Sequence, residues 1–428
     1  MTIKAKILTN TLYQLLAKFV STAGTLLITI IITRILGAVT WGEYSIVISY
    51  TTFFYIFTEF GLNSIAARDF SSKKRVGRSD FYNFLFVRGI HTLIIITLGM
   101  VVLGFMHYPT YINKAIYLSQ ISVLFFSLSS GYNALFQSKL LYKYLFIITC
   151  VFSIINLFLF LFVVNFIKIN LIYLFIPTVL SDLIRFIFAT VIANKVLEKD
   201  KIILTFHRMK YFFFMAIPLG VALIFNTLMT QIDRLMLSVM SQPVFVGYYS
   251  LSYKLFDVLL VLPTFFMNAA FTIFVKKHAS NQGYNKELTL SMYALGLISF
   301  FITIVALTSG WFFIPLIWGQ AMKPAVSSFN ILISGSILFF LSSPLSWIFV
   351  VENKIKYLVY FYTAGFIMNF VLNIFAIKMY GYNGAAVTTI ITELFVLIIL
   401  EIYRRKKLNV KYTSYNPKEL FNLINLNK

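Results

Sequence analysis

Residues 144–167 read YLFIITCVFSIINLFLFLFVVNFI and contain no charged side chain. A helix of about 20 apolar residues is long enough to cross the ~30 Å hydrocarbon core of a bilayer. Apolar stretches of similar length recur along the whole chain, for example at residues 287–318. The pattern therefore predicts an all-α integral membrane protein.

The composition supports the same conclusion. Of the 428 residues, 60% are hydrophobic and only 12% are charged, whereas a water-soluble surface needs many more ionisable side chains. The formal net charge of +22 could indicate a nucleic-acid partner. The basic residues lie in short segments between apolar stretches, however, which is typical of the rim of a membrane protein facing anionic lipid. We therefore expect membrane lipids and no nucleic acid as partners.

The apolar stretches number about twelve, and each predicts a transmembrane helix. The predicted spans are residues 8–33, 43–66, 81–106, 112–137, 144–167, 171–194, 211–240, 246–275, 287–318, 325–350, 357–379 and 383–403. An even number of spans places both termini on the same side of the membrane.

The distribution of lysine and arginine predicts the orientation. With both termini in the cytoplasm, the inner segments hold 26 of these residues. The outer segments hold only Arg34, Lys114, Lys168, Lys323 and Lys378. Short cytoplasmic loops carry the excess of Lys and Arg in membrane proteins, so both termini are predicted to be cytoplasmic.

The longest predicted inner loop lies near the middle of the chain and suggests two lobes. We predict an N-terminal six-helix lobe at 1–194, a cytoplasmic linker at 195–210, a C-terminal six-helix lobe at 211–403 and a basic cytoplasmic tail at 404–428. Two six-helix bundles are a common transporter architecture.

A short internal repeat relates the two predicted lobes. The first span ends in Thr33-Arg34 and is followed by Gly42-Glu43-Tyr44-Ser45, while the seventh contains Asp233-Arg234 and is followed by Gly247-Tyr248-Tyr249-Ser250. Both copies lie on a span that leaves the cytoplasm. The repeat is therefore predicted to be parallel, with a pseudo-two-fold axis along the membrane normal.

These segments resemble a known family. The residues that carry the resemblance are Asn10, Thr33–Gly37, Gly42–Ser45, Gly61-Leu62, Ile232–Leu237 and Val246–Tyr249. Together with the twelve predicted spans, they make the chain similar to the Wzx-type polysaccharide flippases of the multidrug/oligosaccharidyl-lipid/polysaccharide (MOP) exporter superfamily. The turn from Arg34 to Ala38 is also similar to one in lipid II flippases, whose additional helices this chain lacks.

The resemblance implies a function as well as a fold. It implies a fold similar to the multidrug and toxin extrusion (MATE) transporters in a bacterial inner membrane. It also implies that the chain moves a polyprenyl-diphosphate-linked oligosaccharide, such as an O-antigen repeat unit, to the outer leaflet by alternating access. H⁺ or Na⁺ as coupling ion and a polymerase of the same pathway as partner follow from it too.

Cations inside the predicted spans are the candidates for binding the diphosphate. They are Lys18, Arg88, Arg234 and Lys254. Lys18 lies about ten residues into its span, or roughly 15 Å deep, which is too deep for easy snorkelling. A pair with an acid on another helix is the alternative for Lys18, and snorkelling is the alternative for the two arginines.

Acids inside the predicted spans are candidates for binding a coupling proton or Na⁺, or for structural ion pairs. They are Glu59, Asp233, Asp257 and Glu393. The spacing of Lys254 and Asp257 and that of Asp182 and Arg185 also allows pairing along one helix, which we expect for the second pair.

Other functions fit the sequence less well. No P-loop and no cluster at metal-ligand spacing occurs, so neither ATP hydrolysis nor a metal or other cofactor is expected. A cation-coupled multidrug exporter of the same superfamily is the main alternative, although its cavity should be rich in acids. A major facilitator carrier and a membrane-embedded polysaccharide enzyme are further alternatives. The predicted outer loops are short, so we expect a transporter and not an enzyme.

Overall fold

The computed structural model describes residues 3–167, 170–280, 282–408 and 410–413. Over these residues the chain is helical, and its one β-bridge joins Gly77 to Glu198. The chain divides into two compact units, Met1–Thr227 (unit 1) and Leu228–Lys428 (unit 2). Each unit is described by itself below.

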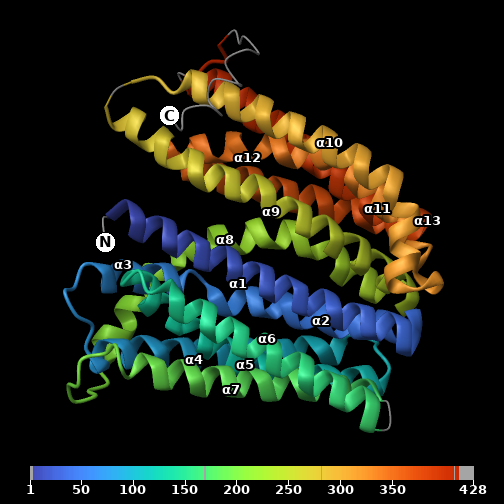
Figure 1. Ribbon diagram of the computed structural model, residues 1–428, viewed down its shortest axis with the longest axis horizontal. Helices are drawn as coiled ribbons and strands as arrows, with labels where there is room; N and C mark the ends of the chain where they lie inside the picture. The colour runs from blue at the N-terminus through green and yellow to red at the C-terminus, as the bar shows by residue number, and fades with distance from the viewer. Residues whose placement is uncertain (1–2, 168–169, 281, 409, 414–428) are drawn as a thin grey trace. The chain divides into compact units, whose positions relative to one another are not determined.

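Unit 1 is a bundle of long helices joined by short turns (Figure 1). Its elements are α1 (Ile3–Ile31), η1 (Ile32–Leu36), α2 (Gly37–Glu59), α3 (Leu62–Ser71), α4 (Arg78–Phe105), α5 (Thr110–Ser138), α6 (Tyr142–Phe166), η2 (Leu171–Phe175), α7 (Ile176–Ala193) and the first part of α8 (Phe206–Met240).

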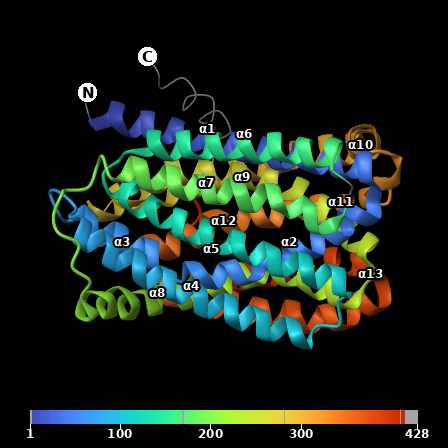
Figure 2. The same ribbon diagram turned by 90° about the horizontal axis from the view of Figure 1, so that it is seen from below.

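Helix α5 lies at the centre of unit 1, in contact with α2, α3, α4 and α7 (Figure 2). Because several helices pack against it, α5 buries polar side chains such as Gln120, Ser127 and Ser130. Small polar residues of this kind are typical of helix contacts in membranes. The position of α5 explains why it is less hydrophobic than α2, α4 and α7.

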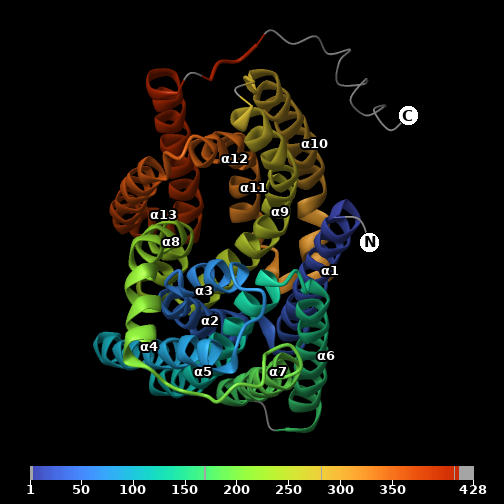
Figure 3. The ribbon, with the colours of Figure 1, turned by 90° about the vertical axis from the view of Figure 1, so that its left-hand side faces the viewer.

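Unit 2 contains the second part of α8 and the helices that follow it (Figure 3). They are α9 (Pro243–Ala279), α10 (Asn285–Trp318), η3 (Gln320–Met322), α11 (Ala325–Ser334), α12 (Ser336–Val351) and α13 (Ile355–Lys407). Helix α12 contacts α9, α10 and α13 and is the central helix of the unit.

Helix α13 is two helices joined at Gly381, whose φ of 58° and ψ of −139° are not helical. A positive φ is readily adopted only by glycine. The chain reverses there, because Thr388 after the glycine donates a hydrogen bond to Asn373 before it. The predicted spans 357–379 and 383–403 correspond to these two halves.

Each unit has its own apolar core. In unit 1, aromatic rings such as Phe70, Phe81 and Phe84 are fully buried. In unit 2, the core includes Phe340 and Phe349. A separate core is what allows a unit to move as one body.

Large apolar side chains also cover the outside of both units, as a protein surrounded by lipid requires. Within the part of the chain that the structure describes, seven helical segments are long and apolar enough to cross a membrane, or nine when two bent pairs are included. The protein is therefore a multi-pass membrane protein. Every predicted span falls on a helix or helix pair, but α5 is not among those segments, so the number twelve, like the orientation, stays a prediction.

The predicted lobes and the two units divide the chain at different places. The units meet between Thr227 and Leu228 inside α8, whereas the predicted linker was 195–210. Contacts of residues 194–205 with unit 1 are described below. The lobe boundaries stay a prediction, and the predicted tail after residue 413 lies outside the described residues.

Candidate functional site

The polar core of unit 2 is centred on Asp233, a carboxylate of α8 that is 1% exposed. Its Oδ1 accepts a hydrogen bond of 2.8 Å from Asn373 Nδ2. Its Oδ2 accepts hydrogen bonds from the hydroxyls of Tyr249 and Thr389, at 2.9 and 2.5 Å. All three donors are neutral, so they stabilise the carboxylate without cancelling its charge.

The amide of Asn373 is fixed by further contacts. Its Oδ1 accepts a hydrogen bond of 2.7 Å from Thr388, and its Nδ2 also donates to Asn369 Oδ1 at 2.8 Å. Since the oxygen is occupied by a donor, the nitrogen must point to Asp233. The two halves of α13 therefore hold the carboxylate of α8 in one geometry.

Glu393 lies one turn after Thr389 on α13 and is 5% exposed. Its Oε1 accepts a hydrogen bond from the hydroxyl of Ser342 on α12. A cavity of about 10 Å³ lies against the carboxylate and is lined also by Asn369, Thr389 and Thr392. This volume suffices for about one water molecule, and the lining oxygens would suit a water or a small hard cation.

No lysine, arginine or histidine in the described part of the chain lies within ion-pair distance of Asp233 or Glu393. The structural bridge that we considered for Glu393 is therefore not formed in this structure. Asp233 and Glu393 are thus two buried acids without a cationic partner in the described residues. Thr389 donates to Asp233 and lines the cavity next to Glu393. The polar core of unit 2 is therefore the strongest candidate for a coupling site. The described residues contain no group of three or more His, Cys, Asp or Glu side chains that could hold a metal.

Arg88 of α4 is fully buried in unit 1 and joins three helices. Its Nη2 lies 2.9 Å from Glu59 Oε2 of α2 and donates also to Ser130 Oγ of α5 at 2.5 Å. Its Nη1 donates to Asn63 Oδ1 at 2.8 Å, and its Nε to the carbonyl of Ser127 at 2.6 Å. Four of the five guanidinium N–H groups are thus used inside unit 1.

These contacts indicate that Arg88 and Glu59 stabilise the helix bundle in this structure. Arg88 has no exposed surface, so its side chain does not snorkel to the membrane surface. Glu59 is the ion-pair partner of Arg88 and is therefore not a free acid in this structure. Binding of substrate by Arg88 stays a prediction, and it would require these contacts to break.

Arg234 and Asp257 lie near each other in unit 2. The guanidinium of Arg234 is 3.9 Å from Asp257 Oδ2 and 4.6 Å from the ring centre of Tyr253. The Asp257 side chain is 50% exposed, and Lys254 is half-buried. Asp257 thus lies near Arg234 and also interacts electrostatically with Lys254, the partner that the spacing allowed. At Asp182 and Arg185 the expected pair is confirmed, at 3.7 Å.

Lys18 is exposed on α1 of unit 1. Arg88 belongs to the same unit and is fully buried, whereas Arg234 and Lys254 belong to unit 2. The roles of these four cations in binding substrate stay predictions.

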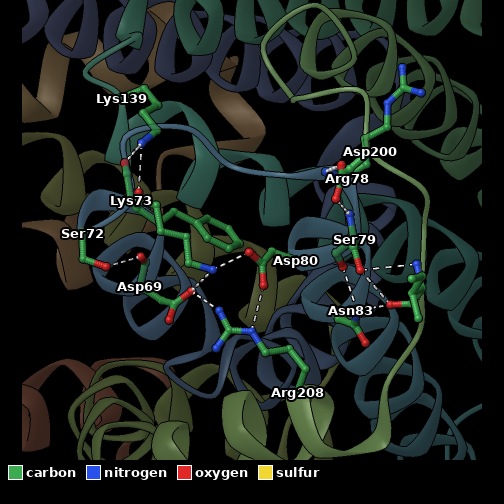
Figure 4. A network of polar contacts seen from close by, with 12 residues as sticks. Asp69, Ser72, Lys73, Arg78, Ser79, Asp80, Asn83, Lys139, Asp200 and Arg208 are labelled. Carbon is green, nitrogen blue, oxygen red and sulfur yellow. Dashed lines mark hydrogen bonds and ion pairs between the residues drawn. The ribbon is translucent and has the colours of Figure 1, made fainter.

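A second polar cluster lies where α3, α4 and α8 meet (Figure 4). Arg208, in the first turn of α8, donates to Asp69 Oδ2 at 2.5 Å and to Asp80 Oδ1 at 2.9 Å. Lys73 forms ion pairs with the same two carboxylates. Nearby, Lys139 donates to the carbonyls of Phe70 and Lys73, and burial lowers the pKa of this lysine.

The connection between α7 and α8, residues 194–205, is bound to the start of α4. The Asp200 carboxylate accepts hydrogen bonds from the backbone N–H groups of Arg78 and Ser79 (Figure 4). This contact satisfies free donors at a helix N-terminus and suits its dipole. In addition, the Thr205 N–H donates to Asn83 Oδ1 at 2.7 Å. The predicted linker is thus a strap on unit 1.

Unit 2 contains the equivalent strap. After α13, the Lys411 N–H donates to Asn285 Oδ1 at 3.0 Å, and the Thr413 N–H donates to Thr289 Oγ1 at 3.0 Å. Asn285 and Thr289 lie in the first turns of α10, the third predicted span of its half, as Asn83 does in α4. In both halves the segment after the sixth span binds the third span, in agreement with the parallel repeat.

Replacing Arg208 by alanine should loosen the first strap. The variant loses two part-exposed ion pairs, each worth about 0.5–1 kcal/mol, so amide hydrogen exchange in residues 194–205 should rise by about tenfold. Lys201→Ala, at an exposed position of the same segment, is the matched control and should change nothing. Equal exchange in all three proteins would show that Arg208 does not hold the strap.

Sequence reasoning found the charged residues of these sites but missed most of their partners. Tyr249 appeared only as a repeat residue, while Thr389, Ser342 and Asn63 were not singled out. The strap contacts of Asp200 and Arg208 were also missed. These partners carried no local signal, because hydroxyl and amide groups are common in membrane helices as interhelical hydrogen-bonding groups.

Sequence comparison identifies the family. The profile of the polysaccharide biosynthesis protein family matches residues 7–278. The chain belongs to this family. The match covers more than half of the chain, including residues 7–227 of unit 1 and the Asp233-Arg234 segment of unit 2. No curated protein sequence matches this chain.

Solved structures of the MOP superfamily have the same fold as this polysaccharide biosynthesis protein. The lipid II flippase MurJ in an inward closed conformation is 16% identical, with a TM-score of 0.74 over 92% of this chain and 87% of that chain. An inward-facing multidrug resistance MATE family transporter is 11% identical, with a TM-score of 0.70 over 91% and 94%. The MATE multidrug transporter DinF-BH is 14% identical, with a TM-score of 0.68 over 96% and 98%.

The resemblance to MOP superfamily flippases and the MATE-like fold class are therefore confirmed. The chain is thus a multi-pass membrane protein of the polysaccharide biosynthesis protein family, with the fold of these flippase and transporter structures.

Proposed function

We propose that this protein moves a polyprenyl-diphosphate-linked oligosaccharide from the cytoplasmic to the outer leaflet of a bacterial inner membrane. The observation that carries the proposal is the match to the polysaccharide biosynthesis protein family over residues 7–278. Such a cargo carries two phosphates, many hydroxyls and a long apolar tail. Only its polar head needs protection from hydrocarbon.

Alternating access is the proposed mechanism. Each unit has a core of its own, so the units could rock as bodies and expose the head group to one side and then to the other. No P-loop occurs in the sequence, so the energy would come from an ion gradient or from consumption of the product outside. A polymerase of the same pathway would be the consuming partner.

The polar core of unit 2 is the proposed site of ion coupling. Asp233 and Glu393 are buried without a cationic partner in the described residues. A buried, uncompensated carboxylate is costly, and binding of H⁺ or Na⁺ would remove that cost. Asp257, which lies by Arg234, and Glu59, which lies by Arg88, are less suitable.

Lys18 is the proposed contact for the diphosphate, because it is an exposed cation within an apolar span. Lys18→Ala should reduce transport of the lipid-linked oligosaccharide by about tenfold at normal protein levels, the loss of one charge-assisted contact of about 1.5 kcal/mol. Lys114→Ala, at an exposed position in a predicted outer segment, is the control. Unchanged transport would remove Lys18 from the binding site.

Deletion of the gene in its host tests the function itself. We expect a complete lipid-linked repeat unit to accumulate on the cytoplasmic leaflet while surface polysaccharide disappears, and its composition would name the sugar. An incomplete or unpolymerised glycan without such accumulation would indicate a pathway enzyme. Unchanged glycans with altered drug sensitivity would favour the multidrug exporter, whose fold is also similar.

A further inference from the structure

An apolar groove runs along the outside of unit 1 between α4 and α8. Its volume is about 530 Å³. On α4, the exposed side chains of Phe86, Ile90 and Ile94 line it at intervals of one helical turn. On α8, it is lined mainly by Phe206, Met209, Phe213 and Phe214. The groove is therefore largely aromatic on the α8 side and aliphatic on the α4 side.

Polar contacts between the strap, α4 and α8 fix the width of the groove at the end where both helices begin, which we call its first end. The Arg208–Asp80 ion pair and the Thr205–Asn83 hydrogen bond tie the start of α8 to the start of α4. The two helices begin side by side and run in the same direction from there. From Phe86 to Ile94 the groove extends roughly 12 Å into the span.

The other end of the groove is also closely packed. A Cβ atom at Gly220 of α8 would lie 2.7 Å from the carbonyl oxygen of Phe60, so the backbones meet there. The rings of Phe60 and Phe213 stack, with their centres 6.0 Å apart, and the ring centre of His91 lies 5.9 Å from that of Phe213. Between these two fixed ends the groove is preformed and does not depend on a ligand.

A positive charge lies at the first end. Lys210 lines the groove, and its ammonium is 5.7 Å from the ring centre of Phe214. Lys199 and Lys201 are exposed on the adjoining strap. The groove therefore combines an apolar channel with a cationic mouth, which matches a lipid that has a long apolar chain and an anionic phosphate at one end.

From this match we propose that the α4–α8 groove binds the polyprenyl chain of the cargo, with its phosphate near Lys210, and so holds the tail while the head group is translocated. The inference rests on the proposed function and adds a binding site for the part of the cargo that stays in the bilayer. The rings of the groove offer broad apolar faces to the methyl-branched, unsaturated chain.

Photocrosslinking of the full chain tests the site. The protein is placed in nanodiscs of phosphatidylethanolamine and phosphatidylglycerol with a photoreactive polyprenyl monophosphate, and labelled peptides are mapped. We expect labelling of α4 and α8. Filling the groove with Ile90→Trp should lower it by about tenfold, whereas Leu93→Trp, at an exposed position of α4 outside the groove, should leave it unchanged.

The charge at the mouth is tested in the same way. Lys210→Gln should lower labelling by about fivefold, the effect of one basic residue near an anionic lipid head, while Lys143→Gln, at an exposed position of α6 outside the groove, should leave it unchanged. Excess phosphatidylglycerol should not compete. The proposal would be overturned if phosphatidylglycerol competed equally well, or if Ile90→Trp left the labelling unchanged. The groove would then be a site for ordinary bilayer lipid.

Complementation of the deletion strain separates this proposal from the proposed function. If the wild-type chain restores surface polysaccharide but the groove variants change neither labelling nor transport, the groove is not the site and the function stands. If the wild-type chain transports no lipid-linked oligosaccharide, the proposed function fails, and the groove proposal falls with it.

Discussion

Replacing Asp233 by asparagine should abolish ion-coupled transport while leaving the protein folded. The buried carboxylate accepts hydrogen bonds from Asn373, Tyr249 and Thr389, and none of these donors supplies positive charge. An amide of the same shape carries no negative charge, so it does not take up a proton near neutral pH and attracts a cation far more weakly. Loss of one partner of a buried charge pair costs several kcal/mol, so affinity for the coupling cation should fall by about 100-fold.

The measurement is transport of the lipid-linked oligosaccharide into proteoliposomes with and without an imposed H⁺ or Na⁺ gradient. The wild-type rate should depend on one of the two gradients, and the rate of the Asp233→Asn protein on neither. Asp257→Asn is the matched control, because that side chain is half exposed. An Asp233→Asn protein that responds to the gradient like the wild type would exclude this acid from coupling.

Removing one of the donors should give a graded result. Tyr249→Phe deletes a single hydrogen bond of 2.9 Å to Asp233 and keeps the ring packing against Tyr253. A hydrogen bond to a charged group contributes about 1.5–3 kcal/mol. The apparent affinity for the coupling ion should therefore change by at least about tenfold, less than for Asp233→Asn.

The helices could be predicted from the sequence because a membrane-spanning helix is a run of consecutive apolar residues. The predicted span 112–137 corresponds to α5 at Thr110–Ser138, although α5 is rich in serine. The Asp182–Arg185 pair was predictable for the same reason, since its members are three residues apart on one helix. Spans and pairs of residues on one helix could thus be predicted from the spacing of residues in the sequence.

The partners of the buried charges could not be predicted. Asp233 is 16 residues from Tyr249 and 156 from Thr389 along the chain. Which of many hydroxyl groups meets the carboxylate depends on how the helices are rotated about their axes. The sequence pattern does not define that rotation when polar and apolar side chains alternate around a buried helix.

The strap is a similar case with a different cause. A polar segment between two predicted lobes is usually read as a free linker. Its attachment to unit 1 depends on Asp200 reaching the N-terminus of α4, 122 residues earlier in sequence. Asp200 is one of two acids in a basic segment, so it carries little local signal. The equivalent contacts of Asn285 in unit 2 became meaningful only when both halves could be compared.

Replacing Arg88 by alanine should strongly destabilise unit 1. The change removes the cation that pairs with Glu59 and the donor to Asn63 Oδ1 and to the Ser127 carbonyl, while Glu59 keeps its hydrogen bond from Asn63 Nδ2. Breaking a buried ion pair on one side costs about 3–5 kcal/mol. We expect the free energy of unfolding in mixed micelles to fall by this amount. In contrast, Arg75→Ala should have little effect, because that side chain is 74% exposed.

A double variant separates a structural role of Arg88 from binding of substrate. Replacing Arg88 and Glu59 together by methionine removes both charges, so the bundle should recover most of the stability that Arg88→Ala loses. If Arg88 only holds helices together, transport should recover with stability. If stability returns and transport does not, the guanidinium is needed for the cargo, as the sequence had suggested. In that case the contacts with Asn63 and Ser130 must open during the transport cycle.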